Sequence, residues 1–227
     1  MQNRALFIGN SDGIGLATTR RLLEAGWEIV GISKSDSSIN NEQYRHYVMD
    51  VSDSKYMDAL DEIVKDDPPD LCIYFAGIGE FLNIRDMSME PKVIDVNFTG
   101  MVRTAAVIIP KMVKIRRGHF IGLSSMADEL ITSEAPSYCA SKAGFSAYLA
   151  ALRRPARKKG IYITNVRFGF VDTKMAKSDV RPFMISVEKA VDHIEYCIRK
   201  KPAHYSAPKI AIPFVKLLKL VMKLKMI

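Results

Sequence analysis

The hydrophobic residues of this chain form short apolar runs, separated by longer stretches in which apolar positions recur every three or four residues. The runs predict strands at residues 4–8, 28–33, 46–51, 71–75, 120–123 and 161–166, with an edge strand at 204–207. The periodic stretches predict helices at 16–25, 52–67, 89–115, 136–159 and 186–200. Strands that alternate with helices pair in parallel through right-handed crossovers. The sequence therefore predicts an α/β fold, a doubly wound parallel sheet with helices on both faces.

No internal repeat or linker interrupts this pattern, so we expect one domain over residues 1–207, followed by a tail at 208–227. One position conflicts with its predicted element. Pro155 lies inside the helix predicted at 136–159, where a proline removes a backbone hydrogen bond and costs ~3 kcal/mol in a regular helix. We expect a kink or an early helix end there.

The tail is apolar but contains lysines at helical spacing. Lys216, Lys219 and Lys223 would form a basic stripe on a helix, opposite a group of apolar residues, Leu217, Leu218, Val221 and Leu224. These charges exclude a membrane-spanning helix. Two interpretations stay open, peripheral contact with an anionic membrane surface and packing on the body or a partner subunit. Packing is the preferred one.

The charge of the chain is concentrated in the same region. The 227 residues carry a formal net charge of +8, and no acidic residue follows Glu195, so the remainder is close to neutral. A basic tail on a neutral body does not favour a nucleic-acid partner.

The three cysteines are far apart in sequence and predict neither a disulfide framework nor a metal cage. The first residues contain no apolar signal-peptide core, so we expect a cytoplasmic protein.

A glycine-rich turn joins the first predicted strand to the first helix. In Gly9-x-x-x-Gly13-x-Gly15, the first glycine allows a sharp turn off the strand. The other two let the backbone approach a pyrophosphate, which the positive end of the helix attracts. Because the turn follows a strand and opens a helix, it predicts a dinucleotide-binding site.

A second motif supplies candidate chemistry. Tyr138 and Lys142 lie four residues apart on a predicted helix and therefore share a face. A neighbouring ammonium lowers the pKa of a phenol, and a phenol of lowered pKa can transfer a proton. Proton transfer at a carbonyl or alcohol carbon must be matched by hydride transfer, which requires a redox cofactor. Ser124 and Ser125 lie shortly before the tyrosine and are candidates to bind the substrate oxygen.

Together these motifs resemble the short-chain dehydrogenase/reductase family over about residues 4–200, with its Rossmann-like fold. The resemblance rests on segments that occur in the family's order. They are the 9–15 turn, Asp50-Val51, Phe75-Ala76-Gly77, Asn97, Ser125, Tyr138-x-x-x-Lys142 and the segment 169–173. The family match implies an NAD(P)-dependent oxidoreductase that interconverts a carbonyl and a secondary alcohol.

The resemblance also implies roles for individual residues. Tyr138 would be the acid–base catalyst, Lys142 would lower its pKa and bind the nicotinamide ribose, Ser125 would bind the substrate oxygen, and Asn97 would hold a water. Ser124 is the alternative to Ser125. No metal is implied. The residues expected to bind the cofactor are Gly9, Ser11, Asp12, Gly13, Ile14, Gly15, Ser33, Lys34, Ser35, Asp50, Val51, Ala76, Gly77, Tyr138, Lys142, Gly169, Val171 and Thr173.

Three positions depart from the family's pattern. Residue 8 is Ile in place of Thr, residue 75 is Phe in place of Asn, and residue 168 is Phe in place of Pro. Neutral drift is the preferred interpretation of these changes. They also motivate a rival hypothesis, a catalytically idle dinucleotide-binding sensor or scaffold.

The residues after the second strand bear on the choice of cofactor. No acidic residue occurs there before Asp36, and Lys34 flanked by hydroxyls suits a 2′-phosphate, which favours NADP over NAD. Asp12 argues against this preference, because many NADP-binding relatives have a basic residue in the glycine turn.

The partners implied are a small carbonyl or alcohol substrate and a second copy of the chain. We expect an apolar substrate, because apolar residues occupy the positions of the pocket wall: Ile78, Phe81, Met126, Leu130, Phe170, Met175, Phe183 and Met184. Family members commonly form dimers or tetramers through their long helices, so the resemblance implies a homodimer or homotetramer.

Overall fold

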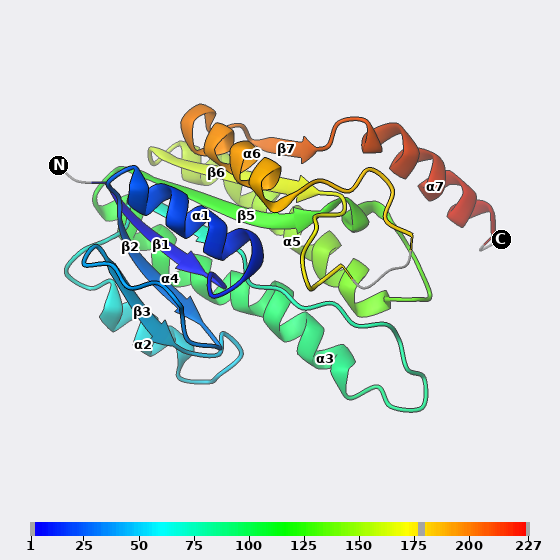
Figure 1. Ribbon diagram of the computed structural model, residues 1–227, viewed down its shortest axis with the longest axis horizontal. Coiled ribbons are helices and arrows are strands. Elements are labelled where there is room, and N and C mark those ends of the chain that lie inside the picture. The colour runs from blue at the N-terminus through cyan, green and yellow to red at the C-terminus, as the bar shows by residue number, and fades with distance from the viewer. Residues whose placement is uncertain (1–2, 177–179, 226–227) are drawn as a thin grey trace.

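The computed structural model of the chain describes residues 3–176 and 180–225. Within these residues, seven strands form one parallel sheet in the order β3-β2-β1-β4-β5-β6-β7. The strands are β1 (Arg4–Ile8), β2 (Glu28–Ser33), β3 (Tyr44–Val48), β4 (Leu71–Tyr74), β5 (Gly118–Ser125), β6 (Ile161–Phe168) and β7 (His204–Ala207). The predicted doubly wound parallel sheet is confirmed (Figure 1).

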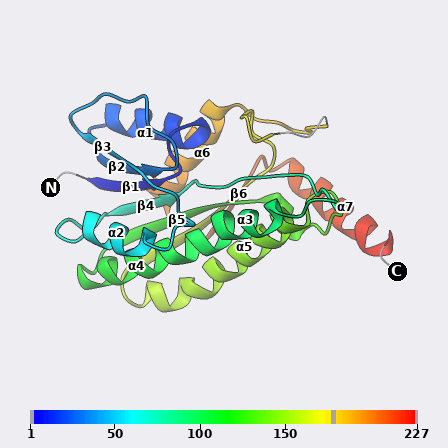
Figure 2. The ribbon, with the colours of Figure 1, turned by 90° about the horizontal axis from the view of Figure 1, so that it is seen from below.

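Helices cover both faces of the sheet, as Figure 2 shows. One face carries α1 (Gly13–Glu24) and α6 (Val187–Lys200), and the other carries α2 (Tyr56–Ile63), α4 (Gly100–Lys114) and α5 (Pro136–Arg157). Each face buries its own apolar cluster against the sheet. Strands of a sheet that is buried on both faces are continuous runs of apolar residues. This is why the strands could be predicted from the sequence.

The predicted helix at 89–115 is continuous but not uniform. It consists of α3 (Met89–Ile94), a π-helical turn at Asp95–Thr99, and α4, which contains Pro110. Among the described residues, this stretch alone has the length and apolar composition of a membrane span. Half of its most apolar window is buried in the protein, so the composition reflects core packing.

The third strand begins two residues earlier and ends three residues earlier than predicted. It spans Tyr44–Val48, because the backbone N–H of Ser52 donates to the Asp50 carboxylate at 2.9 Å and turns the chain away from the sheet. The apolar residues after Val48 had extended the prediction to residue 51. The helix that follows is correspondingly shorter than predicted, at Tyr56–Ile63.

Pro155 does not end the helix α5 at its own position. The helix α5 continues through Pro155 and ends at Arg157, two residues before the predicted end. A proline this close to a helix end removes only one hydrogen bond of the last turns. The expected disruption is therefore limited to the final turn.

Residues 211–225 of the tail form a helix, α7 (Ala211–Lys225), which lies against the body. The Phe214 ring contacts the ring of Phe183 edge-on at 5.8 Å between centroids, and Lys219 Nζ pairs with Glu129 at 3.4 Å. Leu217 and Val221, predicted on the same face as Leu218, are exposed. Residues 226 and 227 lie outside the described residues.

Candidate active site

A cleft of about 1260 Å³ runs along the carboxyl ends of the strands. In open parallel sheets, ligands bind outside this edge, at the point where the strand order reverses. Here the order reverses between β1 and β4, and the turns that follow both strands line the cleft. Segments distant in sequence meet there, from the β1–α1 turn to α7.

The glycine turn forms one wall of the cleft. Gly9 has φ +84°, and a Cβ there would lie 2.5 Å from the backbone of Ala76. A Cβ on Gly15 would lie 2.5 Å from the carbonyl oxygen of Gly9. The turn therefore requires glycine at both positions, and the N-terminus of α1 is left facing the cleft.

We expect Gly9→Ala to destabilise the protein and to weaken dinucleotide binding. The positive φ alone costs about 1–3 kcal/mol for alanine, and the Cβ also displaces Ala76. Gly26→Ala is the matched control, since Gly26 has φ +80° with no atom within 4 Å of its Cβ position. Thermal unfolding and calorimetric titration with NADPH measure the two effects. Equal losses in both variants would contradict the close-approach argument.

Buried polar side chains support the turn from behind. The Ser33 hydroxyl accepts hydrogen bonds from the backbone N–H groups of Asn10 at 2.9 Å and Ser11 at 3.1 Å. The Asn10 amide, fully buried, donates to Thr19 and to the Tyr44 hydroxyl. Ser33 thus holds the turn in place and also lines the cleft, so its predicted contact with the cofactor stays a prediction. Asn10 carried no sequence signal, because its partners lie on three other elements.

Charged residues lie at the two ends of this part of the cleft. Asp12 caps α1 by accepting from the backbone N–H of Gly13 at 2.7 Å, and Lys174 pairs with it at 2.8 Å. At the other end, Asp50 pairs with Lys92 at 3.1 Å and with Lys34 at 3.9 Å. Burial acts to raise the pKa of Asp50, but hydrogen bonds from Ser52 and Lys92 hold it at about 2.

The candidate catalytic residues that line the cleft come from two elements. Ser125 ends β5, and Tyr138 and Lys142 project from the first turns of α5; all three line the cleft. The Lys142 ammonium donates to the Leu123 carbonyl at 2.9 Å and lies 5.8 Å from the centroid of the Tyr138 ring. Ser124 instead bonds to Lys142 O and to the Ser146 hydroxyl, so its hydroxyl is engaged with α5.

The pKa values of these groups differ from the sequence expectation. Burial raises the pKa of Tyr138, while a hydrogen bond with Ser125 opposes the rise. Burial lowers the pKa of Lys142 to about 8, although Asp128 acts in the other direction. The predicted lowering of the phenol pKa by Lys142 is wrong for this geometry, because the ammonium is directed at the Leu123 carbonyl. A neutral phenol at neutral pH is a proton donor.

Asn97 lies behind the cleft and does not line it. Its side chain is fully buried in the π-helical turn, where Oδ1 accepts from Ile78 N at 2.7 Å and Nδ2 donates to Ile78 O and to Ser141 Oγ. A Cβ on Gly77 would lie 3.4 Å from Asn97 Oδ1 and 3.6 Å from Lys142 Nζ. Asn97 and Lys142 therefore flank the same glycine of the cleft wall.

The structure brings the other predicted site residues together. All those expected to bind the cofactor line the cleft, as do all those expected in the pocket wall except Met184. Between Met175 and Met184, which the sequence places in the pocket wall, residues 177–179 lie outside the described residues.

The three departures from the family pattern are accommodated in the apolar core. Ile8 is fully buried, and Phe168 is 4% exposed. The ring of Phe75 packs edge-on against Phe7 at 5.4 Å between centroids. Apolar packing thus occupies the places where the pattern has polar or rigid residues, and none of the three changes removes a candidate catalytic group.

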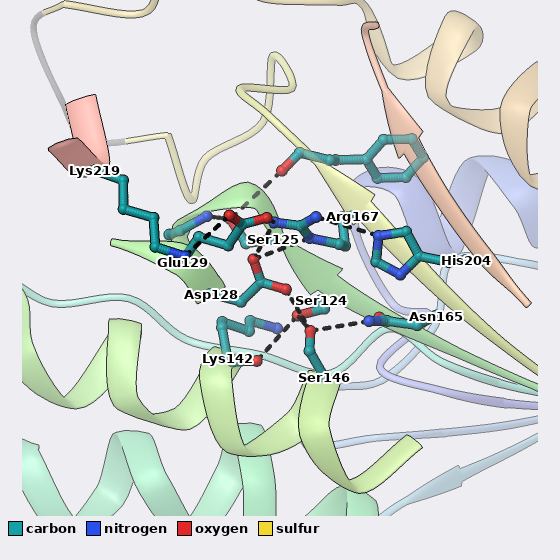
Figure 3. Close-up of polar contacts among 12 residues, drawn as sticks. Ser124, Ser125, Asp128, Glu129, Lys142, Ser146, Asn165, Arg167, His204 and Lys219 are labelled. Carbon is teal, nitrogen blue, oxygen red and sulfur yellow. Dashed lines mark hydrogen bonds and ion pairs between the residues drawn. The ribbon is translucent and has the colours of Figure 1, made fainter. Parts of the chain in front are cut away.

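Sequence reasoning missed a buried ionic network beside the site, shown in Figure 3. Arg167 on β6 donates from Nε to Asp128 at 2.9 Å and also pairs with Glu129. The side chains of Arg167 and Asp128 are 11% and 5% exposed. Ser146 donates to Asp128, and Lys219 of α7 pairs with Glu129. The network holds the turn that follows Ser125, and no local spacing signals it because its residues lie on four elements.

Sequence reasoning also missed the contribution of the tail to the cleft. Five of the described side chains of α7 line it: Ala211, Phe214, Val215, Leu218 and Met222. The tail's apolar periodicity was visible, but the partner of its apolar face was not.

Comparison with known proteins places the chain in a family. The family described as short chain dehydrogenase matches residues 3–182. An uncharacterized oxidoreductase of Staphylococcus haemolyticus is 28% identical over 221 residues, which cover 92% of this chain and 95% of that protein. A second, from Myxococcus xanthus, is 32% identical over 149 residues, 63% of this chain, and the match spans 59% of the relative's own length. The chain belongs to the short-chain dehydrogenase family, whose members are oxidoreductases.

Solved structures of the same class share its fold. A short chain dehydrogenase from Burkholderia cenocepacia, in complex with NADP, superposes with a TM-score of 0.85 at 20% identity, covering 95% of this chain and 93% of that one. A 4-hydroxyisoleucine dehydrogenase complexed with NADH gives a TM-score of 0.82 at 18% identity, over 90% and 96% of the two chains. The predicted family and enzyme class are confirmed.

Proposed function

We propose that this protein uses NADP(H) to interconvert a carbonyl and a secondary alcohol, with Tyr138 as the acid–base catalyst. The observation that carries the proposal is the position of Tyr138. It faces the same cleft as the glycine turn, with Ser125 and Lys142 lining that cleft beside it. The cofactor supplies the hydride when it is bound.

In the proposed mechanism, Tyr138 and Ser125 act on the substrate oxygen. As a carbonyl is reduced, negative charge grows on its oxygen, and two hydroxyl donors directed at that oxygen stabilise the charge. The Tyr138 phenol then gives its proton to the oxygen. Because burial raises the pKa of this phenol, the hydroxyl carries its proton at neutral pH and can act as the donor.

Lys142 and Asn97 have supporting roles in this proposal. Lys142 would bind the nicotinamide ribose, and its pKa of about 8 keeps it mostly protonated at neutral pH. Asn97 flanks the same glycine as Lys142 and would hold a water beside the ammonium. Its amide already fixes the backbone of Ile78, so it also braces the cleft wall.

The donor set of the cleft fits a dinucleotide. The N-terminus of α1 and the glycine turn suit a pyrophosphate. Asp50 and Val51, which follow β3, suit the edge of an adenine ring. Gly169, Val171 and Thr173, which follow β6, also line the cleft, and there they would hold the nicotinamide. These groups belong to one continuous cleft of about 1260 Å³, large enough for a cofactor and a substrate together.

We assign NADP as the preferred cofactor for two reasons. Lys34 is exposed at the end of β2 and, with Ser35, lines the cleft where a 2′-phosphate would lie. The opposing signal from Asp12 is weakened, because Lys174 pairs with its carboxylate. Relatives in solved structures bind either NADP or NADH, so the choice rests on residues of this chain.

Lys34→Ala is expected to raise the Kd for NADPH about tenfold and to leave that for NADH unchanged. A hydrogen bond to a charged group contributes about 1.5–3 kcal/mol, reduced here by the exposure of the lysine. Calorimetric titration with both cofactors checks this, with Lys65→Ala as a control for loss of one exposed lysine. An equal change for NADPH and NADH would contradict the assignment.

Turnover tests the proposed function directly. Purified protein is incubated with NADPH and a panel of ketones and aldehydes, and loss of nicotinamide absorbance is followed. Reduction of at least one carbonyl is expected. Tight NADPH binding without turnover on any carbonyl, or on any secondary alcohol with NADP, would instead support the sensor or scaffold hypothesis.

We further propose a homodimer or homotetramer of cytoplasmic location, formed through the outer faces of the long helices α4 and α5. Sedimentation velocity measures the oligomer.

For the tail, we propose packing on the body in preference to peripheral membrane contact, because one face of α7 lies against the body. Liposome binding measures membrane contact. If deletion of residues 214–227 abolishes liposome binding and leaves the oligomer unchanged, membrane contact becomes the preferred interpretation of the tail.

A further inference from the structure

The helix α7 contributes a continuous apolar wall to the cleft. Its lining residues recur at helical spacing, so they form one stripe along the helix: Ala211, Phe214, Val215, Leu218 and Met222. Among the described side chains of the helix, those at 211, 212, 215, 218 and 222 are buried or half-buried, whereas Phe214 is 40% and Leu217 60% exposed. The protein therefore uses one face of α7 against the cleft and leaves the other in solvent.

The wall begins beside the reaction centre. Ala211 is 5% exposed, and a Cβ on Gly169 would lie 4.0 Å from the Cβ of Ala211 and 3.8 Å from Met126 Sδ. Gly169 follows β6, next to the end of β5 that carries Ser125. From this point α7 extends outward to the end of the molecule, as Figure 1 shows.

The surfaces around the wall are also apolar. Met126 and Leu130, at the two ends of the turn after Ser125, line the cleft, as do Phe170 and Phe183. Phe183 has φ +57°, an uncommon conformation for a bulky residue, and its ring contacts Phe214. The pair of Lys219 with Glu129 fixes α7 to the same turn. The helix is thus attached to the segment that bears the candidate substrate-binding serine.

The length of the wall indicates the length of the ligand. Ala211 and Met222 are eleven positions apart, which corresponds to a rise of roughly 16 Å along a helix. An extended alkyl chain advances about 1.3 Å per carbon, given C–C bonds of about 1.5 Å, so this length accommodates on the order of twelve carbons. A substrate with a short side chain would leave most of the stripe in contact with water.

We propose that the substrate is a long-chain aliphatic carbonyl or secondary alcohol, whose alkyl chain lies along α7 with its oxygen at Ser125 and Tyr138. This inference rests on the proposed function for the position of the oxygen. Leu218, in the middle of the stripe, determines how far the chain extends. The exposed Leu217 has no part in binding it.

A chain-length series tests the channel. With NADPH and 2-alkanones from six to sixteen carbons, kcat/KM is expected to rise about threefold per added methylene and to level off near twelve to fourteen carbons. Leu218→Trp should block the middle of the channel and reduce the ratio of kcat/KM between 2-dodecanone and 2-hexanone at least tenfold. Leu218→Ala, which removes contacts without blocking, should reduce that ratio by a smaller factor.

Leu217→Trp is the matched control, since it adds the same ring to the exposed face of the same helix. It should keep the wild-type series, and thermal unfolding should show all three variants folded. A wild-type series independent of chain length, or identical series for Leu218→Trp and Leu217→Trp, would overturn the inference and leave the proposed function standing.

Binding without turnover separates the two proposals. Calorimetric titration of 2-decanol into the protein should show binding to the wild type and to Leu217→Trp, and at least tenfold weaker binding to Leu218→Trp. If no alkanone is reduced but this pattern holds, the channel stands and the proposed reaction fails. Equal binding to all variants would overturn the channel.

Discussion

Replacing Tyr138 by Phe is expected to lower kcat for carbonyl reduction by about 10²–10⁴, the range that general acid–base catalysis supplies. The variant removes the hydroxyl that gives the proton and retains the ring on the cleft wall. NADPH affinity should therefore change little. Turnover by nicotinamide absorbance and a calorimetric Kd for NADPH measure the two quantities on the same preparation.

Tyr148→Phe is the matched control, because it makes the same change on the same helix, two to three turns further on, where the ring of Tyr148 packs against Phe98. Its kcat should stay near the wild-type value. Full activity of Tyr138→Phe would refute the assignment of the acid–base role. Loss of NADPH binding in that variant would instead show that the hydroxyl acts through the cofactor.

The second large effect concerns stability. Arg167→Met removes the cation that neutralises Asp128 and Glu129 beside the site, and leaves a carboxylate whose side chain is only 5% exposed without its partner. Removing one partner of a buried ion pair costs about 3–5 kcal/mol. For a chain of this size, the loss corresponds to a Tm about 10 °C lower. Thermal unfolding of the two proteins at neutral pH measures it.

Arg4→Met provides a close comparison, because Arg4 also pairs with two carboxylates, Glu28 and Asp67, but at the surface, with 43% of its side chain exposed. Exposed ion pairs contribute about 0–1 kcal/mol, so this variant should be nearly as stable as the wild type. Equal destabilisation by the two substitutions would show that burial of the Arg167 network does not control its contribution.

The fold was largely predictable from the sequence because the sheet is buried on both faces. Each buried strand is an apolar run, and β1 and β2 have their predicted ends. Errors occurred where side-chain hydrogen bonds override apolar patterning. The hydrogen bond between Ser52 N–H and the Asp50 carboxylate ends β3 early. The pattern of apolar residues does not predict this hydrogen bond.

The candidate site was predictable to the extent that its residues belong to local motifs. The glycine turn and the Tyr138-x-x-x-Lys142 pair each lie within one segment, and the structure places both on one cleft. The direction of the phenol pKa was not predictable. It depends on burial and on where the Lys142 ammonium points, which are properties of the folded chain.

Contacts between distant segments were invisible for the same reason. Arg167, Asp128 and Lys219 are separated by tens of residues, so no spacing rule connects them. The sequence showed that α7 has an apolar face. It did not show that this face lines the cleft, because that contact depends on where β7 ends in the folded sheet. Position in the sheet, and not local pattern, decides these contacts.

The last strand runs parallel to β6, so the chain leaves the sheet at the edge where Ser125 and Tyr138 lie. An antiparallel β7 would deliver the following segment to the opposite edge, far from any substrate. This orientation brings the segment that follows β7 beside the cleft, where its residues from Ala211 to Met222 form part of the wall. Substitutions on that face of the segment can therefore change the ligand's surroundings without altering a residue of the sheet.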